Sequence, residues 1–242
     1  MPVHGFTQHL VAIWLFTMAA CLPPAAFALS ENGPAAADQE ISDAEEEEAI
    51  RWVMMEGAQS MIDTLGQENG FYKDPKYRIP MPEQYQKLEK VLRRIGGAKY
   101  ADAFLLSLNK TAENSIAEGG PLITNMISEM PVENRNSLIN GSNGPIGNYF
   151  HGKAATVLLG QFSPIIAKHA DKAGLISSMN VMLEKARFVK ALHKAKVKLD
   201  RMILEHAINL ITIAIKLQEN RIKSDPSART NPVVQKVFGR AF

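Results

Sequence analysis

Apolar residues recur every three or four positions along most of this chain, beginning shortly after Ser42. This spacing places apolar side chains on one face of an α-helix, whereas a half-buried strand would alternate with a period of two. No stretch of the chain sustains that alternation. The sequence therefore predicts an all-α protein, a single-domain multi-helix bundle with antiparallel neighbours. The clearest apolar stripe comprises Ile50, Val53, Met54, Ala58, Met61, Ile62 and Leu65.

Capping and turn residues predict where the helices begin and end. Ser42 and Glu45 have the spacing of a capping box. The acidic run around them is therefore interpreted as a helix start, with a partner-binding tail as the alternative. Residues 70–82 contain Asp-Pro and Pro-Met-Pro, which predict an ordered but non-helical connection. A further helix break is expected at the Gly-Gly-Pro of residues 119–121, and Pro164 predicts a kink or a restart.

The stretch from 202 to 217 is apolar nearly all round. It falls short of the roughly 18 apolar residues that a membrane span needs, so it predicts the central buried helix of the bundle. The chain also contains eleven methionines. Their flexible side chains suit an adaptable apolar cavity, and an ordinary core is the alternative.

The N-terminal region has the features of an export signal. Its first 28 residues contain no Asp, Glu, Lys or Arg, and the apolar run at 10–20 has signal-peptide length. Ala26-Phe27-Ala28 provides the small-x-small pattern of a cleavage site, which predicts a periplasmic chain without cysteine or transmembrane span. The alternative is a lipid anchor on Cys21. The predicted division is 1–28 signal peptide, 29–41 flexible leader and 42–242 helical domain.

The formal charge of +2 conceals an uneven distribution. Residues 31–48 carry eight acids and no base, which leaves 27 bases against 17 acids elsewhere. A basic stretch spans 185–201, and it could rest on anionic lipid headgroups or form a solvated helix face. Nucleic-acid-binding surfaces interleave basic residues with aromatic side chains on which bases stack. Phe188 is the only such aromatic residue in this stretch, so no nucleic-acid partner is predicted. The predicted membrane-facing residues are Lys190, Lys194 and Lys198.

No catalytic, cofactor or metal site is predicted from motifs. The histidines lack the His-Glu-x-x-His or His-x-x-x-His spacing that places two imidazoles on one helical face. No serine lies in Gly-x-Ser-x-Gly. A hydrolase-type enzyme would need a site assembled from distant residues, and a hydrogen-bonded core histidine is the alternative for His206. The candidates for such a site are Glu113, His169, Glu205 and His206.

Short motifs spread from about Ile50 to Gly239 resemble a bacterial exported family catalogued as domain of unknown function 4197. The resemblance implies an all-helical envelope protein and carries no activity with it. The chain departs from the family pattern at 217–220, where relatives usually show an acidic run. The motifs are Gly70-Phe71, residues 78–82, residues 106–109, Ala112-Glu113, Tyr149-Phe150, residues 162–165, Gly174-Leu175 and residues 236–239.

Four polar residues at positions that match the family are the candidate ligand-binding residues. Two interpretations remain open for Arg78, Asn109 and Glu113: a buried network that fixes the 70–82 connection to the bundle, or the polar end of a ligand pocket. The predicted function is non-enzymatic binding of an apolar ligand, a membrane surface or an envelope protein. The alternatives are the enzyme described above and a structural oligomer. The four residues are Arg78, Asn109, Glu113 and Tyr149.

Overall fold

A computed structural model describes residues 40–187 and 197–241 of the chain. These residues form helices joined by turns and contain no strand, which confirms the predicted all-α fold. The predicted signal peptide lies outside the described residues. Ile41, at the end of the predicted leader, already packs against the hydrophobic core. The helices are α1 (Asp43–Leu65), α2 (Glu83–Arg94), α3 (Ala98–Glu129), α4 (Arg135–Asn140), α5 (Pro145–Lys172), α6 (Leu175–Lys185), α7 (Leu199–Ser224) and α8 (Pro232–Ala241), with a short 3₁₀ turn at Pro226–Ala228.

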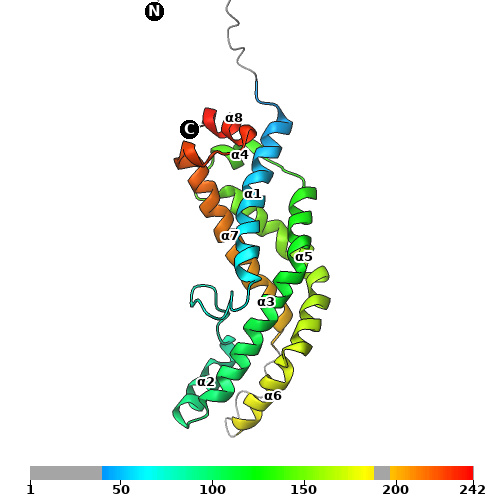
Figure 1. The fold of residues 1–242 in the computed structure, drawn as a ribbon, viewed down its shortest axis with the longest axis vertical. Coiled ribbons are helices and arrows are strands. Elements are labelled where there is room, and N and C mark those ends of the chain that lie inside the picture. Colours follow the sequence, from blue (N-terminus) through cyan, green and yellow to red (C-terminus); the bar gives the residue numbers. More distant parts are fainter. Residues whose placement is uncertain (1–39, 188–196, 242) are drawn as a thin grey trace, which may run out of the picture. The chain divides into compact units, whose positions relative to one another are not determined.

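Four long helices build the core of the unit that begins at Glu40 (Figure 1). Helix α7 packs against α1 and α5, and α3 packs against the same two helices. Helices α2 and α6 lie along α3, whereas α4 and α8 pack against α1. Within residues 40–187 and 197–241, no helix is long and apolar enough to cross a membrane. The core contains five fully buried aromatic rings, those of Phe71, Phe104, Phe150, Phe162 and Phe238.

The acidic run forms the start of α1, as its capping residues predict. The Ser42 hydroxyl accepts a hydrogen bond from the Glu45 amide (3.3 Å), and the Glu45 carboxylate accepts one from the Ser42 amide (2.9 Å). Lys236 of α8 pairs with Glu45 (2.6 Å). Arg135 of α4 pairs with Asp43, with Glu46 and with Glu47. The acidic residues therefore join the first turns of α1 to α4 and α8.

The ion pair between Glu45 and Lys236 makes the stability of the fold decrease at acid pH. Hydrogen bonds from Lys236 and Ser42 lower the pKa of the Glu45 carboxyl from 4.5 to about 2. Because the pKa is depressed in the folded chain, the stabilisation is complete above about pH 4.5 and is lost as the pH falls toward 2. We expect Glu45→Gln to reduce the fall of Tm over that interval, measured by circular dichroism. Glu48→Gln is the control, since Glu48 makes no ion pair among the described residues. If Tm fell equally with pH in Glu45→Gln and in the unaltered chain, the stabilising role of the Glu45 carboxylate would be contradicted.

The helix break expected at residues 119–121 is absent, and no new helix starts at Pro164. Helix α3 continues through Gly119, Gly120 and Pro121, and α5 continues through Pro164. A Cβ atom on Gly119 would lie 2.5 Å from the Phe162 ring, and one on Gly120 would lie 2.8 Å from Ile62. The two glycines therefore permit close contact of α3 with α5 and α1. Packing over these long helices outweighs the local cost of a proline or glycine inside them.

Candidate functional site

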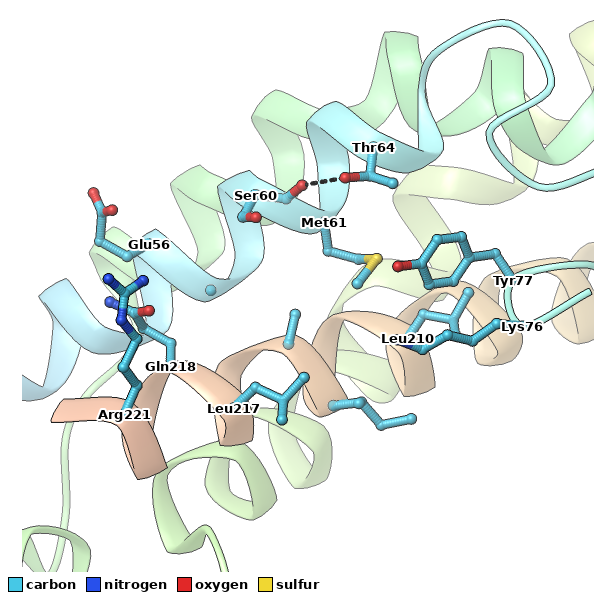
Figure 2. A pocket seen from close by; sticks show the side chains of 13 residues that line it. Glu56, Ser60, Met61, Thr64, Lys76, Tyr77, Leu210, Leu217, Gln218 and Arg221 are labelled. Carbon is cyan, nitrogen blue, oxygen red and sulfur yellow. Dashed lines mark hydrogen bonds between the residues drawn. The ribbon is translucent and has the colours of Figure 1, made fainter. Parts of the chain in front are cut away.

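A hollow lined by both apolar and polar side chains lies between α1 and α7 (Figure 2). Its volume is about 360 Å³. Ile213 and Leu217 remain 46% and 58% exposed, although they belong to a long helix of the core. Exposed apolar side chains gathered in a groove are typical of ligand or partner sites. The apolar lining consists of Met61, Leu210, Ile213, Ala214 and Leu217, and the groove is named the α1–α7 groove below.

Two apolar stripes on α7 explain why it both packs in the core and lines the groove. Residues 208, 211, 215 and 222 are almost fully buried and recur at helical spacing. Residues 210, 213, 214 and 217 follow the same spacing on a neighbouring face and line the groove. The predicted central helix is therefore buried on its first face, whereas Ile213 and Leu217 of the second face stay exposed. Gly57 of α1 makes the close approach of the helices possible, since a Cβ there would lie 2.6 Å from the Cα of Ile215.

The two ends of the groove carry different polar groups. Glu56, Gln218 and Arg221 lie at one end, and Lys76 and Tyr77 lie at the other (Figure 2). The Tyr77 ring projects toward the Met61 side chain (Figure 2). Its hydroxyl makes no hydrogen bond to another described residue, and since no buried polar side-chain atom lacks a partner there, this hydroxyl is open to water. The Lys76 ammonium lies 5.2 Å from the centre of the Tyr77 ring. The α1–α7 groove therefore combines an apolar lining with a cation and a free hydroxyl at one end.

The connection that carries Lys76 and Tyr77 is fixed by buried polar side chains of α3. The Glu113 carboxylate accepts hydrogen bonds from the amides of Phe71 (3.3 Å) and Tyr72 (3.2 Å). The Asn109 side chain accepts from the Ile79 amide (2.8 Å) and donates to the Ile79 carbonyl (3.1 Å). These bonds satisfy backbone groups that no helix or strand would satisfy at this position.

Two further side chains brace the same connection. Arg78 donates from Nε to the Tyr72 carbonyl (2.7 Å), and its guanidinium lies 4.7 Å from the centre of the Tyr72 ring. His206 of α7 donates from Nε2 to the Tyr77 carbonyl (3.0 Å), which fixes the backbone beside the groove. Burial lowers the pKa of the His206 imidazole, while its hydrogen bond to the Tyr77 carbonyl acts in the opposite direction. Lys76 and Tyr77, which line one end of the α1–α7 groove, therefore belong to a connection held by several side-chain hydrogen bonds.

The structure brings together three of the four predicted ligand-binding residues, although not in the groove. Arg78, Asn109 and Glu113 all bind the 70–82 connection, in agreement with the buried-network interpretation. Tyr149 lies elsewhere, where its hydroxyl donates to the Pro131 carbonyl and accepts from the Glu133 amide. Direct ligand binding by the four residues stays a prediction. The groove residues themselves were missed, and the repeat of 210, 213, 214 and 217 was the available signal.

The four residues proposed for an assembled enzyme site each bind a different group. Glu113 binds the backbone of the 70–82 connection, and His206 binds the Tyr77 carbonyl. His169 pairs with Glu118 (2.9 Å), and Glu205 pairs with Arg201 (2.7 Å). None of the four shares a hydrogen bond with another in the described part of the chain. In the same part, no group of three or more His, Cys, Asp or Glu side chains could hold a metal ion.

The predicted membrane-facing lysines are only partly covered by the structure. Lys190 and Lys194 lie outside the described residues. Lys198 is exposed immediately before α7 and borders a hollow of about 590 Å³ between α5 and α6. The membrane-facing role of the three lysines stays a prediction.

The comparisons with known proteins give a family and no function. No curated protein and no solved structure matches the chain. The model of the family described as protein of unknown function (DUF4197) matches residues 40–239, which include every helix named above except the last residues of α8. The match extends over most of the chain and agrees with the resemblance carried by the motifs between Ile50 and Gly239. The chain therefore belongs to the DUF4197 family.

Proposed function

We propose that this chain is an exported binding protein that holds the apolar part of a lipid-like ligand in the α1–α7 groove. The observation that carries the proposal is the exposure of Ile213 and Leu217 on the second apolar face of α7. Covering apolar surface contributes about 25 cal/mol for each Å² removed from water. An alkyl chain lying on these two side chains would remove such surface from water on both partners.

Export is the second part of the proposal, and it is supported by the N-terminal sequence. Residues 1–28 combine an uncharged apolar run with the Ala26-Phe27-Ala28 cleavage pattern. The mass of the processed chain distinguishes the two export routes. Cleavage after Ala28 yields a chain beginning at Leu29, whereas lipid attachment yields a heavier chain beginning at Cys21. An intact Met1 terminus on a cytosolic chain would contradict export.

Native mass spectrometry of the chain purified from its own cell envelope tests the binding function. We expect part of the unaltered chain to carry additional apolar mass, and Leu217→Gln to carry less of it. Loss of that apolar contact corresponds to roughly tenfold weaker binding of an alkyl ligand. Ile95→Gln is the matched control, because Ile95 is also 58% exposed but lies at the end of α2, outside the groove.

Two results would contradict the binding function. One is a bare mass for the unaltered chain together with no binding of added alkyl probes. The other is an equal loss of bound mass in Leu217→Gln and Ile95→Gln, which would place the ligand outside the α1–α7 groove.

A further inference from the structure

We infer that the α1–α7 groove orients its ligand, with an anionic head group at Lys76 and Tyr77 and a single alkyl tail along Met61, Ile213 and Leu217. This inference rests on the proposed function and specifies the class of ligand. The shared chemistry of the head group is a carboxylate or phosphate oxygen that accepts hydrogen bonds. A single-chain anionic amphiphile, such as a fatty acid or an alkyl phosphate, has this chemistry.

The distribution of charge around the groove favours this orientation. Its charged lining residues are Glu56, Lys76 and Arg221. Glu56 and Arg221 share one end, so their opposite charges offset each other there (Figure 2). Lys76 lies at the other end and makes no ion pair with any described residue. The nearby Asp74 carboxylate accepts a hydrogen bond from the backbone amide of Lys76 (2.8 Å). The positive end of the groove is therefore the Lys76 end, where an anion is attracted.

Tyr77 supplies a hydrogen-bond donor directed into the groove. Its hydroxyl lies near the Met61 side chain and makes no hydrogen bond to another described residue (Figure 2). No buried polar side-chain atom in the described part lacks a partner, so this hydroxyl is reached by water before a ligand displaces it. The backbone of Tyr77 is held by His206, and Ile79 two residues later is held by Asn109. A donor fixed before the ligand arrives loses little conformational freedom on binding. Hydrogen bonds to an ionised acceptor are also stronger than those to a neutral one.

The size of the groove favours one alkyl chain. Leu210 and Leu217 are two helical turns apart, so the apolar stripe on α7 extends over roughly 10 Å at 1.5 Å per residue. The volume of about 360 Å³ lies at the small end of the range for ligand pockets. A single tail lying along α7 from Tyr77 toward Arg221 is consistent with both dimensions.

Isothermal titration of the full chain with four dodecyl probes tests the inference, each probe being kept below its critical micelle concentration. The probes are dodecanoate, dodecyl phosphate, dodecanol and dodecyltrimethylammonium. We expect the two anions to bind about tenfold more tightly than dodecanol, and the cation to bind most weakly. The stronger of the two anions identifies the head group as carboxylate or phosphate. The anionic preference should decrease as the salt concentration rises.

Three variants locate the head group. Tyr77→Phe removes only the hydroxyl and should reduce dodecanoate binding about tenfold and dodecanol binding less, since the hydrogen bond to a neutral acceptor is weaker. Lys76→Gln should reduce dodecanoate binding about threefold, which is the effect expected from the loss of an exposed ion pair. Lys73→Gln is the control, since Lys73 is exposed in the same connection but does not line the groove.

The outcomes separate this inference from the proposed function. Equal binding of dodecanol and dodecanoate, unaffected by Tyr77→Phe, would overturn the head-group assignment and leave apolar binding intact. An anionic preference lost in Arg221→Gln and kept in Lys76→Gln would reverse the orientation and so overturn it as well. Failure of all four probes to bind would overturn the proposed function and this inference together.

Discussion

Glu219→Ala is expected to destabilise the fold by about 3–5 kcal/mol, the range for removing one member of a buried ion pair. Glu219 is fully buried on α7. Its Oε1 atom lies 2.7 Å from the Lys223 ammonium, and its Oε2 atom accepts hydrogen bonds from the Ile146 (3.1 Å) and Gly147 (3.4 Å) amides. Those amides belong to the first turn of α5, where no helical acceptor exists for them. The substitution therefore removes a charge partner and, with Oε2, the single acceptor of two hydrogen bonds from the first turn of α5.

Urea denaturation monitored by circular dichroism measures this effect. Glu205→Ala is the matched control, because Glu205 pairs with Arg201 on the exposed side of the same helix. We expect that control to change the free energy of unfolding by less than about 0.5 kcal/mol. Glu219→Gln keeps an oxygen acceptor for the α5 amides and loses the charge, so it should fall between the two. A Glu219→Ala variant as stable as Glu205→Ala would show that the ion pair and the α5 cap contribute little.

Asn109→Ala is expected to cost about 2–4 kcal/mol, because it leaves both backbone groups of Ile79 buried without their partner. The Asn109 side chain is fully buried and also donates to the Leu105 carbonyl (2.8 Å). The same change should loosen the connection that carries Tyr77. Hydrogen exchange at the Ile79 amide should therefore accelerate more than exchange in the core of α7.

Asn125→Ala provides the comparison for Asn109→Ala. Asn125 is exposed on the same helix, so its replacement should leave both stability and Ile79 exchange nearly unchanged. Equal stabilities for the two alanine variants, with unchanged exchange at Ile79, would contradict the anchoring role of Asn109.

Much of the fold could be predicted from the sequence because its main signals are local. The three-four apolar spacing and the Ser42–Glu45 capping box depend on neighbouring residues, and both gave correct helices. The helix break predicted at the Gly-Gly-Pro of residues 119–121 was wrong because the role of these residues is not local. The two glycines serve contacts with Phe162 and Ile62, which lie far away in the sequence, and local turn preferences do not register such contacts.

The candidate site was harder to predict than the fold. The sequence shows that α7 is apolar on two faces, but only the packing of α1 and α5 shows which face stays uncovered. Arg78, Asn109 and Glu113 were recognised as a polar group, and their shared role follows from the backbone path of residues 70–82. The Glu219 cap was missed, because nothing near position 219 in the sequence indicates that the start of α5 packs against it.

Methyl spectra of methionine-labelled protein, recorded during titration with dodecanoate, test the α1–α7 groove most directly. Met61 lines the groove, whereas Met54 on the same helix is fully buried in the core. Met61→Leu assigns the reporter signal with little disturbance to packing. The account predicts that the Met61 methyl resonance shifts with increasing dodecanoate while that of Met54 stays in place. Binding that leaves Met61 unchanged, or that instead shifts Met179 beside the hollow between α5 and α6, would contradict it.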